Sequence, residues 1–485
     1  MRNPNRLSII VLIIFLVYNI YRYIKEIISP TPMSKESILL SISFAVATFL
    51  IYLFRTEKQT ILKGNYVSIV VIISLSMIIV HYFEYLSWIT GAVKYIRYIE
   101  YYDNRLLNAS VIASVSGYIS FTIGALLPKY PFTDFSENLP KCNIKSILNK
   151  LQFISLVVFV AFIDKNYFKG GYNEVSNTTG MNVIAAIAQQ VIMAAMLANV
   201  ASKALTIKAV NFIQYIKQYS ILFYFVNIVY FFLVISSGDR GPMIYMSMMY
   251  VAGYFICSYK KLSLKKALIG LIFASFFLNV LGSVRSLGQG EFSIDKVVQG
   301  YKIYQERIDD ENEFAATNEL STSVMSYNII YCYTYNTGIL GGIGMLNHLL
   351  GIIPGARYIL YNYILGIDIK SVDIIPGRVA TKLLDRENGA GTTCFADVYF
   401  DLGFIGLIVI FLLFGVLMRK LDLSLYNNHQ NPIVMIFAIG YFSFSIYIGR
   451  ADIFSPIIIC SYALLLYFFC QMRRDKFFIQ KNKKS

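Results

Sequence analysis

The chain has 485 residues, of which 56% are hydrophobic and only 15% are charged, and its mean hydropathy is +0.57. This composition excludes an ordinary soluble domain and predicts a polytopic membrane protein. The apolar runs are about twenty residues long, which is typical of membrane helices rather than of β-barrel strands. The net charge of +15 indicates contact with anionic lipid headgroups and gives no support for nucleic-acid binding.

Twelve apolar stretches are predicted to cross the membrane as helices. In chain order they are residues 7–24, 36–54, 65–83, 106–127, 150–163, 181–201, 219–237, 241–258, 266–283, 396–418, 432–448 and 453–471. The first leads directly into further spans, so we expect a retained signal anchor. The seventh and eighth are separated only by a short turn, so we expect them to form a helical hairpin.

Basic residues are unevenly distributed among the predicted loops. If the N-terminus is cytoplasmic, the loops on that side contain more than half of the 43 lysines and arginines. The positive-inside rule therefore predicts that both termini lie in the cytoplasm.

The longest predicted loop, residues 284–395, lies on the outer side between the ninth and tenth spans. Its first part, residues 291–325, is polar and acidic, whereas residues 338–367 are apolar but interrupted by glycines and a proline. We expect this second part to form interfacial or re-entrant helices. Without a repeat or a low-complexity linker, the chain is expected to form one integral domain, residues 1–485, with 284–395 as a helical cap.

The six cysteines show no metal-binding spacing, and only Cys332 and Cys394 are predicted to face outward. Two buried thiols are the favoured interpretation for this pair, and a disulfide is the alternative. The sequence also lacks the common metal and nucleotide motifs, so we expect neither a metal site nor a cofactor.

Several arginines are predicted at the outer ends of helices, where they could form one anionic site. Arg240 lies in the turn between the seventh and eighth spans, Arg285 follows the ninth, and Arg450 lies near the outer end of the eleventh. A guanidinium binds phosphate oxygens bidentately and keeps its charge. The alternative is that they are interfacial side chains, or that Arg240 and Arg450 pair with Asp239 and Asp452.

Arg378 precedes a glycine-containing segment that leads into the tenth span. Gly389 and Gly391 could let backbone N–H groups approach a phosphate or an oxyanion beside Arg378. The alternative interpretation is a flexible loop.

A hydroxyl acceptor would require a general base on the outer side. The candidate bases are His348, Asp239, Glu387 and Asp397, followed by the pair of His81 and Glu84. His348 is one of only three histidines and lies in the apolar part of the outer loop, where its pKa could be near neutrality. The alternative for His348 is an interfacial histidine whose hydrogen bonds are all made within the protein. The alternative for Asp397 is a structural partner of an arginine.

The whole chain resembles the Wzy-type O-antigen polymerases, which are the oligosaccharide repeat-unit polymerase family. The resemblance rests on the turn at residues 236–242 and on the large outer loop before the last three spans. It also rests on Arg378, which is separated from Gly389 by ten residues, and on the entry into the tenth span at residues 391–403. The chain departs from relatives with two arginine-to-glycine loops, because only the loop at Arg378 is evident.

The resemblance implies a GT-C-like glycosyltransferase on the outer face of the bacterial inner membrane. Such an enzyme transfers a growing glycan from undecaprenyl pyrophosphate to a new lipid-linked repeat unit and needs no cofactor, because the pyrophosphate supplies the activation. Its expected partners are membrane lipids, a chain-length-regulating co-polymerase and a flippase. The catalytic residues would be Arg240, Arg378, His348, Asp239 and Glu387, and the substrate-binding residues would be Arg285, Arg450, Gly389, Gly391, Asp397 and Tyr399.

Two other functions fit parts of the sequence. An O-antigen ligase would share the outer loop and the arginines but would use a different acceptor. A lipid-linked oligosaccharide flippase should show two related halves, charges at the span centres and short outer loops, which this sequence lacks.

Overall fold

The computed structural model describes residues 5–55, 68–93, 96, 99–132, 145–165, 167, 180–207, 210–237, 239, 241–258, 295, 298–302, 323–353, 356–364, 366, 374–385, 390–426 and 431–482. All regular secondary structure in these ranges is helical, which confirms the predicted all-α fold. Each predicted span except the ninth coincides with a helix, and the ninth, residues 266–283, lies outside the described residues.

Six of the described helices are long and apolar enough to cross a membrane. They are α1 (Arg6–Ile28), α2 (Lys35–Leu53), α3 (Ile69–Thr90), α4 (Leu107–Leu126), α6 (Gly180–Thr206) and α17 (Cys394–Tyr426). Further helices on predicted spans are α5 (Lys145–Phe162), α8 (Ile221–Ser237), α9 (Gly241–Ser258), α18 (Pro432–Phe444) and α19 (Ser455–Asn482). The architecture is that of a helical membrane protein, while the number of twelve spans and the GT-C-like fold stay predictions.

Shorter helices connect these elements. They are η1 (Ile99–Tyr101), η2 (Asn104–Leu106), α7 (Phe212–Ile216), α13 (Val324–Thr337), α14 (Ile343–Leu350), α15 (Ala356–Tyr358), the π-helix η4 (Ile359–Ile364), α16 (Pro376–Leu383) and η5 (Ile448–Arg450). The described part of the predicted outer loop, residues 284–395, therefore includes helices α13 to α16.

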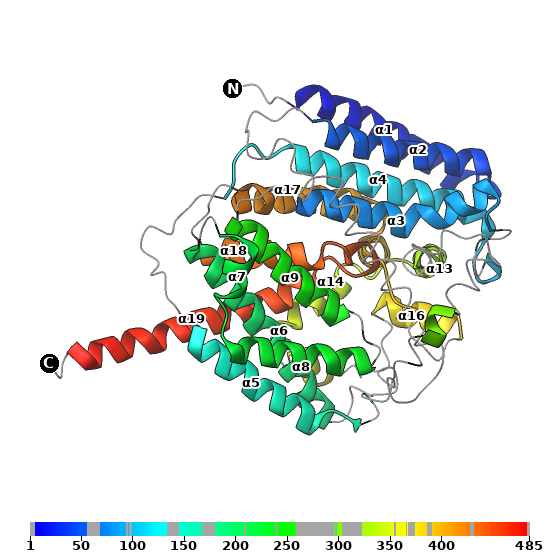
Figure 1. Ribbon diagram of the computed structural model, residues 1–485. Coiled ribbons are helices and arrows are strands. Elements are labelled where there is room, and N and C mark those ends of the chain that lie inside the picture. The colour runs from blue at the N-terminus through cyan, green and yellow to red at the C-terminus, as the bar shows by residue number, and fades with distance from the viewer. Residues whose placement is uncertain are drawn as a thin grey trace.

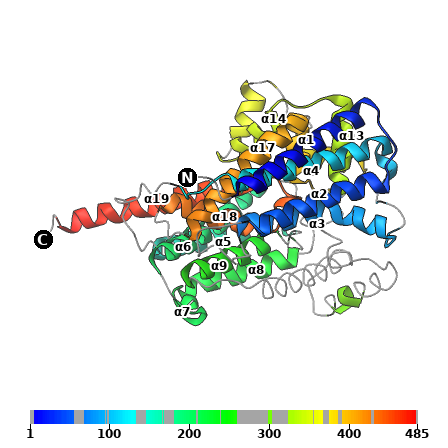
Figure 2. The same cartoon turned by 90° about the horizontal axis from the view of Figure 1, so that it is seen from above.

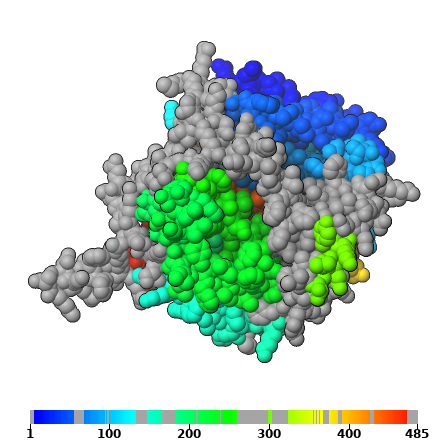
Figure 3. Space-filling model, viewed as in Figure 1, coloured from blue at the N-terminus to red at the C-terminus, as the bar shows by residue number. Residues whose placement is uncertain are grey.

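The main helices form two groups that lie side by side (Figures 1 and 2). Helices α1 to α4 pack with α17 in the first group, and α5, α6, α8, α9, α18 and α19 form the second. The contacts of α17 with α18 and of α3 with η5 join the two groups. In Figure 3 the green atoms of α8 and α9 cover the front of the second group, with the blue N-terminal helices along the upper edge.

Polar side chains fix the starts of the helices. Ser34 accepts a hydrogen bond from the backbone N–H of Ser37 at 3.1 Å at the start of α2. At the start of α3, Asp422 of α17 accepts one from the backbone N–H of Ile69 at 2.8 Å. The first N–H groups of a helix have no partner inside it, so these side chains stabilise the helix ends.

Helices α4 and α17 approach so closely that their crossing requires glycine. A Cβ atom on Gly124 would lie 2.0 Å from the backbone oxygen of Leu412, and one on Gly415 would lie 2.0 Å from that of Phe121. Small residues let membrane helices pack backbone against backbone. Since α4 is buried along its whole length, it is the central helix of the first group.

Polar side chains also join helices of the second group. Asn199 Nδ2 of α6 donates to Asn149 Oδ1 of α5 at 2.7 Å, and Asn149 Nδ2 donates to Ser220 Oγ before α8 at 2.6 Å. Hydrogen bonds between membrane helices contribute about 0.6 kcal/mol each on average. These contacts therefore fix the relative position of α5, α6 and α8.

Helix α17 is interrupted at Gly403, which has a φ of 66° in the left-handed region that favours glycine. Nearby, the backbone oxygens of Phe400 and Asp401 accept hydrogen bonds from the N–H groups of Leu340 at 3.1 Å and Gly341 at 2.8 Å. The loop before α14 is thus attached to α17 close to the break, and α14 lies beside α17 in Figure 2.

Candidate functional site

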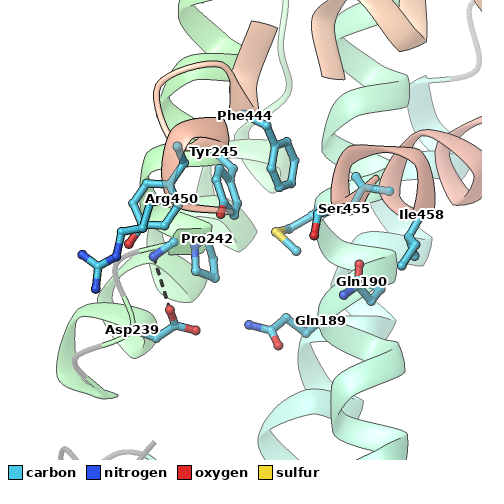
Figure 4. A pocket seen from close by; sticks show the side chains of 13 residues that line it. Gln189, Gln190, Asp239, Pro242, Tyr245, Phe444, Arg450, Ser455 and Ile458 are labelled. Carbon is cyan, nitrogen blue, oxygen red and sulfur yellow. Dashed lines mark hydrogen bonds between the residues drawn. The ribbon is translucent and has the colours of Figure 1, made fainter. Parts of the chain in front are cut away.

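A cavity of about 370 Å³ lies in the second helix group, between α6, α9, η5 and the start of α19 (Figure 4). Its wall consists of Gln189, Gln190, Met193, Asp239, Gly241, Pro242, Tyr245, Phe444, Tyr447, Arg450, Ser455, Ile458 and Ile459. The cavity therefore combines polar side chains from segments that are far apart in the sequence.

Asp239, one of the predicted site residues, lines the cavity where α8 is followed by α9. Its Oδ1 accepts a hydrogen bond from the backbone N–H of Gly241 at 3.2 Å, and its own N–H donates to Ser237 Oγ at 3.2 Å. Figure 4 shows Asp239 and Gln189 pointing toward one another across the cavity. The turn thus holds a carboxylate on one wall opposite an amide on the other.

Arg450, a second predicted site residue, lies on the same side of the cavity as Asp239 (Figure 4). Its guanidinium carbon lies 5.9 Å from the centre of the Tyr447 ring, within the range of a cation–π contact. The turn that carries it is fixed by α3, because the N–H of Gly449 donates to Ser76 Oγ at 3.0 Å. A Cβ atom on Gly449 would lie 2.7 Å from the Ser76 backbone oxygen, so the close approach requires glycine.

The chemistry of the cavity suits a ligand that carries both hydroxyl and anionic groups. Arg450 can only donate hydrogen bonds, whereas the carboxylate of Asp239 accepts them. Among the described residues, Gln190 Oε1 is buried without a hydrogen-bond partner. An unsatisfied buried acceptor favours a ligand that donates, as a sugar hydroxyl does and a fully ionised phosphate does not.

Asp452 lies between this cavity and the predicted histidine. Its carboxylate accepts hydrogen bonds from the N–H groups of Phe454 at 2.8 Å and Ser455 at 2.5 Å, and from the Ser455 hydroxyl. His348 Nδ1 lies 3.6 Å from Asp452 Oδ1. Since Ser455 also lines the cavity, Asp452 connects the cavity wall to His348.

A second, smaller pocket brings together His348 and Asp397, both predicted site residues. Its wall consists of Gly344, Met345, His348, Ile374, Pro376, Asp397, Phe400, Asp401 and Phe454. Asp397 Oδ1 accepts a hydrogen bond from Thr392 Oγ1 at 3.1 Å, while its Oδ2 is buried without a partner in the described part of the chain. The structure therefore places Asp397 with His348 and not in the cavity of Asp239 and Arg450.

Arg378 lies exposed on α16, and it is not among the residues that line the cavity. The glycine segment does lie beside the start of its helix, because a Cβ atom on Gly377 would be 3.0 Å from the Gly391 backbone oxygen. The N–H of Ala390 also donates to Thr381 Oγ1 of α16 at 2.9 Å. The structure thus brings Gly391 close to the helix of Arg378, and neither residue lines the cavity of Arg450.

Tyr399, predicted to bind substrate, is buried and belongs to a group of three tyrosines with the buried Tyr331 and the half-buried Tyr23. Its ring stacks on that of Tyr331 with centroids 4.4 Å apart, and its hydroxyl lies 3.3 Å from the hydroxyl of Tyr23. Tyr331 also donates to Tyr23 at 3.1 Å. These contacts join α1, α13 and α17.

The remaining predicted residues either lie elsewhere or fall outside the described ranges. His81 is buried in α3, where its ring lies 4.5 Å from that of Phe395, and it does not line the cavity. The predicted residues outside the described ranges are Arg240, Arg285, Glu387 and Gly389.

The two cysteines that were predicted to face outward, Cys332 and Cys394, are separate buried thiols, so the favoured interpretation of two thiols is confirmed. Cys332 lies on α13 and Cys394 begins α17. Burial raises the pKa of the Cys332 thiol to about 12, so this group stays un-ionised at neutral pH.

No protein-family model matches the sequence, and no curated protein or solved structure is significantly similar to it.

Two polar groups that line the pockets were missed by the sequence reasoning, namely Gln189 with Gln190, and Asp401. The two glutamines are polar exceptions in an apolar span, which is a readable signal. Asp401 lies one helical turn after Asp397, so it shares the same face.

Proposed function

We propose that the protein polymerises undecaprenyl-pyrophosphate-linked oligosaccharide repeat units into O-antigen or capsular-type polysaccharide. The observation that carries this proposal is the cavity of about 370 Å³ with Asp239, Gln190 and Arg450 in its wall. A polar cavity among apolar helices suits a substrate with a sugar, a pyrophosphate and a lipid tail. The resemblance of the sequence to the repeat-unit polymerases supports the same reaction.

In the proposed reaction the acceptor hydroxyl oxygen bonds to the anomeric carbon of the growing chain. The bond from that carbon to the pyrophosphate oxygen breaks, and undecaprenyl pyrophosphate leaves with the electron pair. The hydroxyl proton passes to a base, for which Asp239 is the best placed of the predicted candidates because it lines the cavity. Arg450, together with Arg240, which follows Asp239 in the sequence, stabilises the charge on the leaving pyrophosphate.

The other polar groups have supporting roles in this proposal. Gln190 accepts a hydrogen bond from a sugar hydroxyl, since its buried oxygen otherwise lacks a donor. His348 orients Asp452 and, through it, the Ser455 hydroxyl in the cavity wall. Arg378 is exposed on α16, so its proposed role changes from the reaction itself to capture of an incoming lipid pyrophosphate. The site faces the outer side of the bacterial inner membrane.

The proposal is tested with purified protein in vesicles that contain lipid-linked repeat units of the source cell, without nucleotide or added metal. The expected product is a ladder of polymer lengths on a gel. Arg450→Ala should lower the rate about 10²–10³-fold because one charge-stabilising donor is lost, and Asp239→Asn about 10²–10⁴-fold because the base is lost. Lys382→Ala, an exposed cation on α16, should leave the ladder unchanged and serves as the control.

Other outcomes of this assay identify the alternatives. Transfer only to a lipid A core acceptor would favour an O-antigen ligase, and translocation without any glycosidic product would favour a flippase. Normal ladders from both Arg450→Ala and Asp239→Asn would refute the assignment of the cavity as the active site. Arg378→Ala should raise the KM for the lipid-linked unit more than it lowers kcat.

A further inference from the structure

An apolar row covers the outer face of α14 and the turn that follows it. Ile343, Leu346, Leu349 and Ile353 recur every three or four residues, and each side chain is 45% to 63% exposed. On the opposite face of α14, Asn347 is buried. Since residues at this spacing share one side of a helix, α14 presents a continuous apolar surface outward.

At both ends of α14, backbone groups form hydrogen bonds with buried or half-buried side chains. Asp401 Oδ1 accepts hydrogen bonds from the N–H groups of Gly342 at 3.0 Å and Gly344 at 2.9 Å, and Oδ2 accepts from that of Met345 at 2.9 Å. Asp401 is only 1% exposed. In water these N–H groups would need no such partner, but in lipid each unsatisfied group costs several kcal/mol.

A backbone oxygen in the C-terminal part of α14 also forms a hydrogen bond with a side chain. Arg357 Nε donates to the backbone oxygen of Asn347 at 2.7 Å. Burial lowers the pKa of the Arg357 guanidinium, and the nearby carboxylate of Asp452 acts in the opposite direction. A carboxylate at the start and a guanidinium at the end of α14 both complement the helix dipole.

Exposed apolar side chains also lie along α17, the helix against which α14 packs. On α17, Ile405, Val409 and Leu413 are exposed at a spacing of four residues, and α17 is one of the membrane-spanning candidates. Helix α14 packs against α17 where Asp401 precedes the break. The part of α17 after the break, from Phe404 to Arg419, is roughly 22 Å long at about 1.5 Å per residue. This distance fits within a hydrocarbon layer about 30 Å thick.

We propose that α14 and the π-helix η4 are embedded in the outer half of the lipid bilayer, with the apolar row against acyl chains. Ile359 and Ile364 of η4 are exposed as well and extend the same contact. The inner side of α14 meanwhile carries His348 toward the smaller pocket. This inference goes beyond the proposed reaction and holds whatever the enzyme transfers.

The test uses the fact that the chain contains a single tryptophan, Trp88. In a Trp88→Phe background, Leu346→Trp and Leu349→Trp place the fluorophore in the apolar row. Val409→Trp on α17 is the lipid control, and Lys382→Trp on α16 is the control exposed to water. Each full-length protein is reconstituted into phosphatidylcholine vesicles with or without bromine on the acyl chains, and aqueous iodide is added in a parallel measurement.

We expect bromolipid to quench the fluorescence of both row variants as strongly as that of the Val409→Trp variant, with little quenching by iodide. The Lys382→Trp variant should show the reverse. Strong iodide quenching without bromolipid quenching at both row positions would overturn the proposal, because the row would then face water. Using two row positions keeps the test decisive if one variant fails to fold. Neither measurement depends on enzyme activity, so failure of the polymerase proposal would leave it unaffected.

Discussion

At the scale of single residues, Asp401 shows how a buried charge can serve the fold next to a reaction site. Its two carboxylate oxygens accept three backbone N–H groups at the start of α14. The same residue lines the pocket of His348 and Asp397. Helix α14, and with it His348, is therefore positioned by a carboxylate that takes no part in the proposed reaction.

We predict that Asp401→Asn destabilises the protein by about 1–3 kcal/mol, because the amide removes one acceptor and the charge. Thermal unfolding in detergent, followed by circular dichroism, measures this loss. The control is Asp385→Asn, since Asp385 is exposed and has a φ of 48° that asparagine also tolerates. An equal effect of both substitutions would contradict the capping role.

Polar and charged residues of the site could be recognised from the sequence because they lie at the predicted outer ends of spans or in the predicted outer loop. Asp239, Arg450, His348 and Asp397 were singled out in this way, and each lines one of the two pockets. Their division into two pockets could not be predicted, because it depends on how α14 and η5 pack against α17 and α3.

At the scale of helices, the crossing of α4 and α17 depends on two glycines. A Cβ atom at Gly124 or Gly415 would lie 2.0 Å from the backbone of the other helix. The helices would have to move apart to accept a methyl group, and overpacking of this kind costs about 1–3 kcal/mol.

We therefore expect Gly124→Ala and Gly415→Ala each to lower the unfolding temperature. The double variant should lower the unfolding temperature by less than the sum of the two single effects, because either substitution alone already moves the two helices apart. Val409→Ala on the exposed face of α17 is the control and should have little effect. Strict additivity in the double variant would mean that the two glycines act at independent contacts.

The long helices could be predicted because an apolar stretch of about twenty residues is a local property of the chain. The predicted span 36–54 differs from α2 by one residue at each end. The break at Gly403 was not predicted, because it is linked to hydrogen bonds from Leu340 and Gly341 that are distant in the sequence. The short helix α14 and the π-helix η4 lie in such context-dependent regions as well.

At the scale of the whole molecule, α1 begins and α19 ends at the same side (Figure 1). This agrees with an even number of crossings, and the distribution of basic residues predicts that this side is the cytoplasm. The turns that carry Asp239 and Arg450 would then lie toward the outer side.

Reporter fusions in bacterial cells test this orientation. Green fluorescent protein fused after residue 485 should fluoresce, and alkaline phosphatase fused after residue 91, beyond α3, should be active. Alkaline phosphatase fused after residue 128, beyond α4, should be inactive and serves as the control. An active phosphatase after residue 485 would reverse the predicted orientation.

The cavity has a consequence for how related proteins could be found. Its wall is assembled from separate segments between residues 189 and 459, each contributing one to a few side chains. No continuous stretch of sequence therefore has to be retained. Each segment can change in sequence as long as its side chains in the pocket wall stay in place. Distant relatives should accordingly be sought by the spatial arrangement of an amide pair, a carboxylate and a guanidinium around four helix segments. A linear motif would miss them.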